Sequence, residues 1–360
     1  MRSWKLCLLL TVIPMAAQQP PVRPDGLYAE IRTSKGLIVA RLESDLVPMT
    51  VANFVGLAEG TIANPAFDAG RPFYDGAVWH RVVPGHVIQT GIPQSDRSRG
   101  PGYMFPNEIH ARLSHNRAGV LNMANSGPNT SAAQFCITLG DRSYLDGDFN
   151  VFGEVVEGLD VVMRIVQGDT VESVRIVRVG ARAQAFHPTT ESFRALVKAA
   201  EERVAEHVEK KKLAEAEWIA RNYPHAAGPA GGVLTQVIAE GQPAASTGAR
   251  QVRYSGREIR YVGDVIGHEG PPIQEIRFSS GDTGLPGFED APHWFPMSKL
   301  NPGLDSAIAA MAPGERRIVI VPAALGYGRA GSYPPEVPGK RRFVVSPNAL
   351  LVYEVEVGGR

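Results

Sequence analysis

The chain has 360 residues, enough for two domains that each bury a core, and its 37 Lys and Arg residues balance 37 Asp and Glu residues. A net charge of zero gives no electrostatic case for nucleic acid or an anionic membrane as a partner. The apolar run within residues 1–17 is too short to span a membrane, and no other stretch reaches the roughly 18 uninterrupted apolar residues that a span needs.

Residues 1–17 have the pattern of a cleaved secretory signal peptide. Arg2 and Lys5 precede a short apolar core that ends at Ala16 and Ala17. We therefore expect an exported protein, periplasmic or secreted, with no membrane anchor after cleavage. The chain has 2 cysteines, and one of them lies in this segment, so Cys136 would remain alone, without an intrachain disulfide.

The first region beyond this segment is rich in predicted strands. Residues 27–42 alternate around a turn and predict a hairpin. Residues 48–60 carry apolar side chains at helical spacing and end in glycine, which predicts a helix that plugs one end of a closed sheet. A second helix is expected near residues 158–166, and a further strand over 174–179.

Residues 73–91 contain polar side chains at strand positions. Asp75-Gly76 and Pro84-Gly85 indicate turns, and the runs beside the second turn are β-branched and aromatic. Arg81 and Gln89 interrupt these apolar runs. By spacing alone, Arg81 is either a rim residue with its stem over apolar surface or a residue with a chemical task.

Two motifs in this region resemble the signatures of the cyclophilin family of peptidyl-prolyl isomerases. The first is the series Phe-Tyr-Asp-Gly, His-Arg-Val-Val-Pro-Gly and Gln-x-Gly within residues 73–91. The second runs over residues 121–135 and continues at 145–147 and 151–153, in the family's own order and spacing. The resemblance covers residues 27–182 and implies a closed β-barrel of about eight strands with two helices.

Residues 189–221 contain no Pro or Gly and have apolar side chains three and four residues apart. The pattern predicts one helix, about 45 to 50 Å long. Two arrangements are open: the helix is a semi-rigid spacer between independent domains, or it packs lengthwise on one domain.

Residues 231–358 form a second β-rich region after a Pro/Gly linker. The motifs around Tyr254, Leu304, Tyr327 and Tyr353 resemble the FKBP family, the other large class of prolyl isomerase. The resemblance implies an α+β half-barrel, so the whole chain is expected to be mainly β with some α.

Rotation about an Xaa-Pro bond faces a barrier of about 18 to 20 kcal/mol, because the nitrogen lone pair is delocalised into the carbonyl. Catalysis requires an apolar slot for the ring, groups that hold the flanking backbone, and a donor that favours a pyramidal nitrogen. No cofactor or metal is needed, and the 9 histidines lack metal-ligand spacing.

The cyclophilin resemblance implies a role for each residue of the first site. Arg81 is implied as the donor, with Gln89 and Asn125 holding the substrate carbonyl and backbone and Gln134 steadying a wall. The residues expected to bind substrate are His86, Val87, Ala124, Gln134, Cys136, Tyr144, Leu145 and Phe149.

The first pocket departs from the family at several positions. Cys136 stands where the family has a second Phe, His86-Val87 replaces Phe-Met, Tyr144 replaces a frequent Trp, and Phe149 a frequent His. Loss of the Phe ring forgoes about 2 to 3 kcal/mol of apolar burial. Two roles are therefore open for residues 27–182: an active isomerase, or a vestigial domain that only binds proline.

For the second head the resemblance implies a proline pocket without arginine, lined by aromatic side chains. Leu304 stands where the family often has Trp, and Ser279 stands where it has Asp. Two roles are therefore open for this domain: fast isomerisation, or proline binding without fast turnover. The residues implied are Tyr254, Phe278, Leu304, Tyr327 and Tyr353.

The sequence thus predicts an exported, two-headed peptidyl-prolyl isomerase that acts on unfolded or partly folded proline-containing polypeptides. A holdase-like chaperone with catalytically weak heads is the second hypothesis, and a scaffold with inactive pockets is the third.

Overall fold

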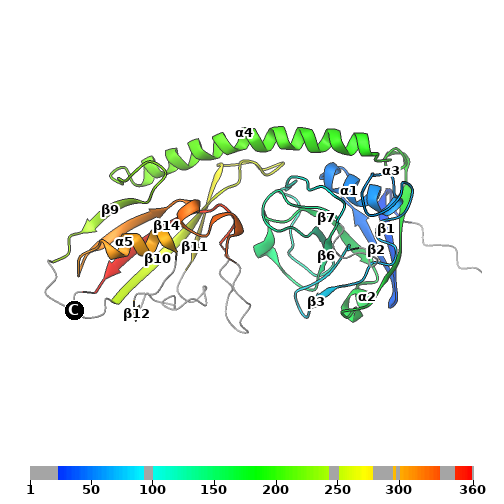
Figure 1. The fold of residues 1–360 in the computed structure, drawn as a ribbon, viewed down its shortest axis with the longest axis horizontal. Helices are drawn as coiled ribbons and strands as arrows, with labels where there is room; N and C mark the ends of the chain where they lie inside the picture. Colours follow the sequence, from blue (N-terminus) through cyan, green and yellow to red (C-terminus); the bar gives the residue numbers. More distant parts are fainter. Residues whose placement is uncertain are drawn as a thin grey trace, which may run out of the picture.

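The computed structural model describes residues 23–92, 100–242, 251–278, 295–296, 301–332 and 345–358. The expected signal peptide lies outside these residues. The described chain forms two β-rich lobes that lie side by side, and one long helix, α4, runs along both of them (Figure 1).

The first lobe is built on an eight-stranded antiparallel sheet in the order β3-β4-β6-β5-β7-β2-β1-β8. Its two ends meet at a bridge between Val78 and Thr170, just before β3 and β8, so the sheet curls around a core. The strands are β1 (Gly26–Thr33), β2 (Gly36–Leu42), β3 (Arg81–Val83), β4 (Val87–Thr90), β5 (Val120–Met123), β6 (Phe135–Thr138), β7 (Val151–Glu157) and β8 (Val171–Val179).

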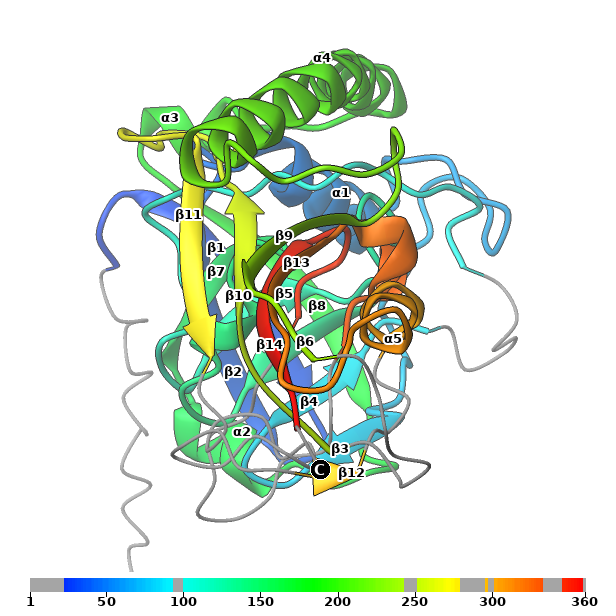
Figure 2. The same ribbon diagram turned by 90° about the vertical axis from the view of Figure 1, so that its left-hand side faces the viewer.

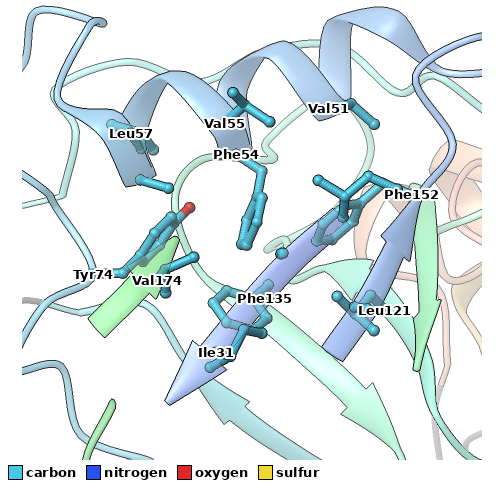
Figure 3. Packing of buried hydrophobic residues seen from close by; sticks show 14 of the residues in the cluster. Ile31, Val51, Phe54, Val55, Leu57, Tyr74, Leu121, Phe135, Phe152 and Val174 are labelled. Carbon is cyan, nitrogen blue, oxygen red and sulfur yellow. The ribbon is translucent and has the colours of Figure 1, made fainter. Parts of the chain in front are cut away.

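Helix α1 (Pro48–Glu59) covers one end of the curled sheet, as its apolar spacing predicts. Phe54 projects from the helix into a group of aromatic rings, with centroids 5.2 Å from Tyr74, 5.3 Å from Phe135 and 5.2 Å from Phe152 (Figure 3). All four rings are fully buried. The shorter helices α2 (Leu159–Arg164) and α3 (Ala181–Gln184) and a 3₁₀ turn (Ser143–Leu145) complete the lobe.

The start of α1 is stabilised by a carboxylate distant in sequence. Val47, at the N-cap, provides no side-chain cap. Glu108 instead accepts hydrogen bonds from the backbone N–H groups of Met49 and Thr50, at 3.1 and 2.7 Å, and from the Thr50 hydroxyl at 2.8 Å. A buried negative group is favourable there because the first N–H groups of a helix have no partner within it.

Helix α4 (Thr190–Asn222) begins with a capping box formed by Thr189 and Ser192. Near its start, Phe193 and Ala200 belong to the core of the first lobe, and α4 contacts α1. Near its end, Trp218 packs in a cluster with strands of the second lobe. Of the two arrangements that the sequence leaves open, the packed helix is observed, and it extends to both lobes because apolar side chains at each end pack against a lobe.

The second lobe is built on a sheet in the order β11-β10-β14-β13-β9, with β12 paired to β10. Alternate residues of its strands point to opposite faces. Val319, Val321 and their neighbours pack under helix α5, which lies along one side of the sheet (Figure 2), whereas Ile318 and Ile320 face the cluster around Trp218. The elements are β9 (Leu234–Ala239), β10 (Gln251–Tyr261), β11 (Ile273–Phe278), β12 (Phe295–Pro296), α5 (Pro302–Ala309), β13 (Arg316–Val321), two 3₁₀ turns (Ala323–Leu325 and Gly328–Ala330) and β14 (Leu350–Val357).

The two lobes also touch directly. The Ile266 N–H donates to the Ile109 carbonyl at 2.8 Å, and the Ala111 N–H donates to the Ile266 carbonyl at 2.9 Å. Arg260 donates to the backbone carbonyl of Asp146 at 3.0 Å. The side chain of its ion-pair partner Glu258 is fully buried, at 3.0 Å from Arg260 Nε. Within the described ranges, no helix is both long and apolar enough to span a membrane.

Candidate active site

A cavity of about 690 Å³ opens on the first lobe where β3, β4, β6 and β5 lie next to one another. The cavity gathers every residue expected for the first site except Gln134. Its lining consists of Arg81, Val83, Pro84, His86, Val87, Gln89, Asn122, Ala124, Asn125, Cys136, Tyr144, Leu145 and Phe149.

Four polar side chains form one row across the floor of this cavity. Arg81 on β3 is directly opposite Gln89 on β4, and Gln89 is opposite Cys136 on β6. Cys136 in turn is opposite Asn122 on β5. Residues directly opposite one another in antiparallel strands share a face, so the register delivers all four side chains to the cavity.

Hydrogen bonds fix the orientation of the first half of the row. Arg81 is exposed, but its Nη1 donates to Gln89 Oε1 at 3.1 Å. Gln89 Nε2 then donates to Gln134 Oε1 at 2.8 Å. Gln134 therefore lies behind Gln89 and holds it, although Gln134 itself does not line the cavity.

The segment that follows Gln89 approaches the segment that carries Gln134 closely at Gly91. A Cβ at this position would lie 2.6 Å from the Ala133 carbonyl oxygen, and its φ of +96° lies in the region that favours glycine. This contact explains the glycine of the Gln-x-Gly motif.

Asn125 is held in the wall of the cavity. Its Nδ2 donates to the Asp148 carbonyl at 2.8 Å, and its Oδ1 accepts from the Gly127 N–H at 3.1 Å. The neighbouring Ala124 N–H donates to the Gln134 carbonyl at 2.8 Å. Asn125 thus holds the segment before Phe149, while Ala124 bonds the residue that precedes β6.

The segment from Tyr144 to Phe149 continues this wall. His86 Nε2 and the Tyr144 hydroxyl form a short hydrogen bond. Asp146 anchors this segment by accepting from Ser114 Oγ at 2.6 Å and bonding His115 Nδ1 at 2.6 Å. Burial pushes the pKa of Asp146 upward, but the hydrogen bonds from His115 and Ser114 outweigh it, so its pKa lies below the usual value.

Known proteins match the first lobe closely. The family model described as cyclophilin type peptidyl-prolyl cis-trans isomerase matches residues 28–181. A probable peptidyl-prolyl cis-trans isomerase A of Mycobacterium leprae is 44% identical over 133 residues, which are 36% of this chain and 73% of the relative. The chain belongs to the cyclophilin-type peptidyl-prolyl cis-trans isomerases.

Two further comparisons cover most of a cyclophilin-type protein. The peptidyl-prolyl cis-trans isomerase ppi1 of Schizosaccharomyces pombe is 38% identical over 161 residues, 42% of this chain and 97% of the relative. A solved cyclophilin type isomerase of Cryptosporidium parvum aligns with 43% of this chain and 99% of its own, with 24% identity and a TM-score of 0.37.

The second lobe contains a match to another isomerase family. The family model described as FKBP-type peptidyl-prolyl cis-trans isomerase matches residues 275–358. The chain therefore combines a cyclophilin head, residues 28–181, with a following FKBP-type segment. The two families share the reaction of rotating Xaa-Pro bonds but not the fold that performs it.

The residues expected for the second head come together in one buried cluster. Tyr254, Leu304 and Tyr353 share the core under α5, and Tyr327 packs against it. The Tyr254 and Tyr353 rings are 6.0 Å apart at 76°. Phe278 ends β11, but its side chain lies outside the described residues, as do Ser279 and Ser280.

Asn301 adds a polar group to this cluster that the sequence motifs do not indicate. Its Oδ1 caps α5 by accepting from the Leu304 N–H at 2.9 Å, and its Nδ2 donates to the Tyr353 hydroxyl at 3.1 Å. The only signal for it in the sequence is an Asn directly before Pro302, at an N-cap position.

The cyclophilin head has the parts that bond rotation requires. The guanidinium of Arg81 is permanently charged and presents several N–H donors in a fixed plane. Val87, Leu145 and Phe149 supply apolar lining beside it. Burial raises the pKa of the Cys136 thiol to about 12, although Arg81 lowers it in part, so the thiol is neutral and serves as lining rather than as a nucleophile.

Proposed function

We propose that the cyclophilin head performs Xaa-Pro rotation in the cavity at the junction of β3, β4, β6 and β5, with Arg81 as the catalytic donor. The observation that carries the proposal is the hydrogen-bonded series Arg81, Gln89, Gln134, which fixes a cationic donor beside an apolar lining. A charge-assisted hydrogen bond contributes about 1.5 to 3 kcal/mol net. Desolvation and positioning of the peptide supply the remainder of the rate enhancement.

In this proposal the substrate prolyl ring enters between Val87, Leu145 and Phe149. Arg81 donates toward the prolyl end of the peptide bond and withdraws electron density that would otherwise keep the bond conjugated. Gln89 orients the guanidinium and meets the substrate backbone. Asn125 fixes the wall that carries Phe149.

The second lobe acts, in this proposal, as an FKBP-like α+β half-barrel whose Tyr254, Leu304, Tyr327 and Tyr353 surround a second proline ring. Its contacts favour binding by apolar burial rather than by a charged donor, because the cluster is aromatic and aliphatic. The long helix α4 would keep the two heads in a fixed arrangement.

The substrates in this proposal are unfolded or partly folded proline-containing polypeptides outside the cytoplasm. The export part rests on the pattern of residues 1–17 alone. Its test is the mature N-terminus and the cell fraction of the protein. A new N-terminus near Gln18 in the exported fraction supports it, and an uncleaved cytoplasmic protein contradicts it.

The assignment to the two heads is tested by isomerisation of a short Xaa-Pro peptide in the presence of a cyclic-peptide inhibitor, a macrolide inhibitor, or both. We expect the cyclic peptide to remove most of the activity. Turnover that survives the cyclic peptide but not the macrolide would place the principal site in the second lobe.

A further inference from the structure

The row of polar side chains on the cavity floor ends at the amide of Asn122, which has no role in the proposed reaction. Asn122 on β5 lines the cavity, and only 2% of its surface is exposed. Its neighbours Leu121 and Met123 are fully buried in the core on the other face of the sheet, so the side chain of Asn122 must point toward the cavity. Within the described residues, Asn122 Nδ2 has no hydrogen-bond partner.

The groups around Asn122 cannot satisfy this amide. On one side it faces Cys136, whose neutral thiol is a weak hydrogen-bonding group, and on the other it faces the aliphatic Val151. The next polar side chain of the row, Gln89, is already engaged by Arg81 and Gln134. A buried polar group without a partner is destabilising, and such groups are rare in native proteins.

We propose that Asn122 is a specificity-determining residue that receives a hydrogen-bonding substituent on the far side of the substrate ring, so that the cyclophilin head accepts 4-hydroxyprolyl as well as prolyl residues. Asn122 lies opposite the small Cys136 and lines the same cavity as the apolar side chains. A hydroxyl both donates and accepts, so it matches the amide whichever of its two atoms faces the ligand. This inference rests on the proposed use of the cavity for isomerisation.

The test compares three peptides that differ only in the imino acid: proline, (4R)-hydroxyproline and (4R)-fluoroproline. Fluorine resembles the hydroxyl in its electron withdrawal and its effect on ring pucker, but when bound to carbon it is a very poor acceptor for the Asn122 Nδ2–H group and cannot donate a hydrogen bond. The full chain is assayed with a macrolide present to silence the second head. The quantity of interest is kcat/KM for hydroxyproline divided by that for fluoroproline.

We expect this ratio to fall about fivefold in Asn122→Leu. A fivefold change corresponds to the net free energy of one hydrogen bond. Cys136→Phe is the second variant, to be used if Asn122→Leu fails to fold. The larger ring should cover the Asn122 amide without changing it, so the ratio should again fall. A ratio that is unchanged in the folded variants overturns the inference, whatever their turnover of the proline peptide. Absence of turnover of the proline peptide by the wild type contradicts the proposed function itself.

Discussion

Gln89 Oε1 accepts a hydrogen bond from Arg81 Nη1 at 3.1 Å across the β3–β4 pair. An exposed arginine would ordinarily sample many rotamers, and ordering such a side chain costs up to about 2 kcal/mol. Because Gln89 is itself held by Gln134, the guanidinium is ordered before a peptide arrives. The donor is therefore preorganised by two amides rather than by burial.

Removing Gln134 Oε1, which accepts a hydrogen bond from Gln89, should loosen the orientation of Gln89 and of the Arg81 guanidinium. In Gln134→Leu, Gln89 Nε2 loses its partner, and we expect kcat/KM to fall about three- to tenfold, in proportion to one hydrogen bond. Gln134→Glu is the matched control because it keeps an acceptor oxygen at the same place. Peptide isomerisation with the macrolide present measures both, and equal losses in the two variants would show that the hydrogen bond has no orienting role.

Cys136 should resist alkylation in the folded protein at neutral pH. Burial raises its pKa from 9.0 to about 12, and only the thiolate reacts. We expect slow labelling by iodoacetamide at pH 8 that accelerates about tenfold per pH unit up to the folded pKa. Since the folded pKa lies above the unfolded one, the stability contributed by the neutral thiol is complete below pH 9 and is lost as the pH rises toward about 12.

Mass spectrometry of timed labelling tests the cysteine prediction, with protein in denaturant as the control. Fast labelling at pH 8 without denaturant would mean that the thiol is not buried in the cavity floor.

Helix α4 should be part of both folding units. Phe193 is 3% exposed and contributes to the core of the first lobe, so Phe193→Ala should destabilise that lobe by about 3 to 5 kcal/mol. The control on the same helix is Leu213→Ala, because Leu213 is 65% exposed. Denaturant unfolding measures both variants. A Phe193 variant as stable as the Leu213 variant would restore the free-spacer interpretation.

Arg260, which donates to a carbonyl of the first lobe, is also ion-paired with a buried carboxylate on its own strand. Arg260→Met leaves the carboxylate of Glu258, whose side chain is fully buried, without its partner, and we expect a loss of about 3 to 5 kcal/mol. The double variant with Glu258→Gln removes the charge as well and should recover most of this loss. Thermal unfolding of the single and double variants decides the point, and a double variant no more stable than the single one would exclude the ion pair as the cause.

The residues expected for the first site come from two motifs, within residues 73–91 and 121–153, whose resemblance to the cyclophilin signatures implies one shared pocket. Arg81 and Gln89 lie eight residues apart around one turn, and strand pairing places them opposite each other. Alternation likewise brings Cys136 to the cavity floor. Asn122 was not predicted as a site residue, although a polar side chain between the apolar Leu121 and Met123 is itself a signal for a special position.

Contacts between distant segments could not be predicted from the sequence. Glu108 caps a helix 58 and 59 residues before it, and nothing in its own neighbourhood indicates that role. The sequence does not decide how α4 docks, because its apolar stripe is compatible with a free or a packed helix. The contact of Arg260 with the carbonyl of Asp146, across 114 residues, likewise depends on how the two lobes come together.

The most direct test of the account is the activity of Arg81→Ala on a short Xaa-Pro peptide with the second head silenced by a macrolide, measured together with its melting temperature. Arg81 is exposed, so its removal should leave the fold and melting temperature unchanged, while kcat/KM falls at least about tenfold through loss of a charge-assisted hydrogen bond in the transition state. Arg81→Lys, which keeps the charge but not the planar donor, should remain well below the wild type. Unchanged turnover in Arg81→Ala, or a loss of activity matched by a loss of melting temperature, would contradict the assignment of Arg81 as the catalytic donor.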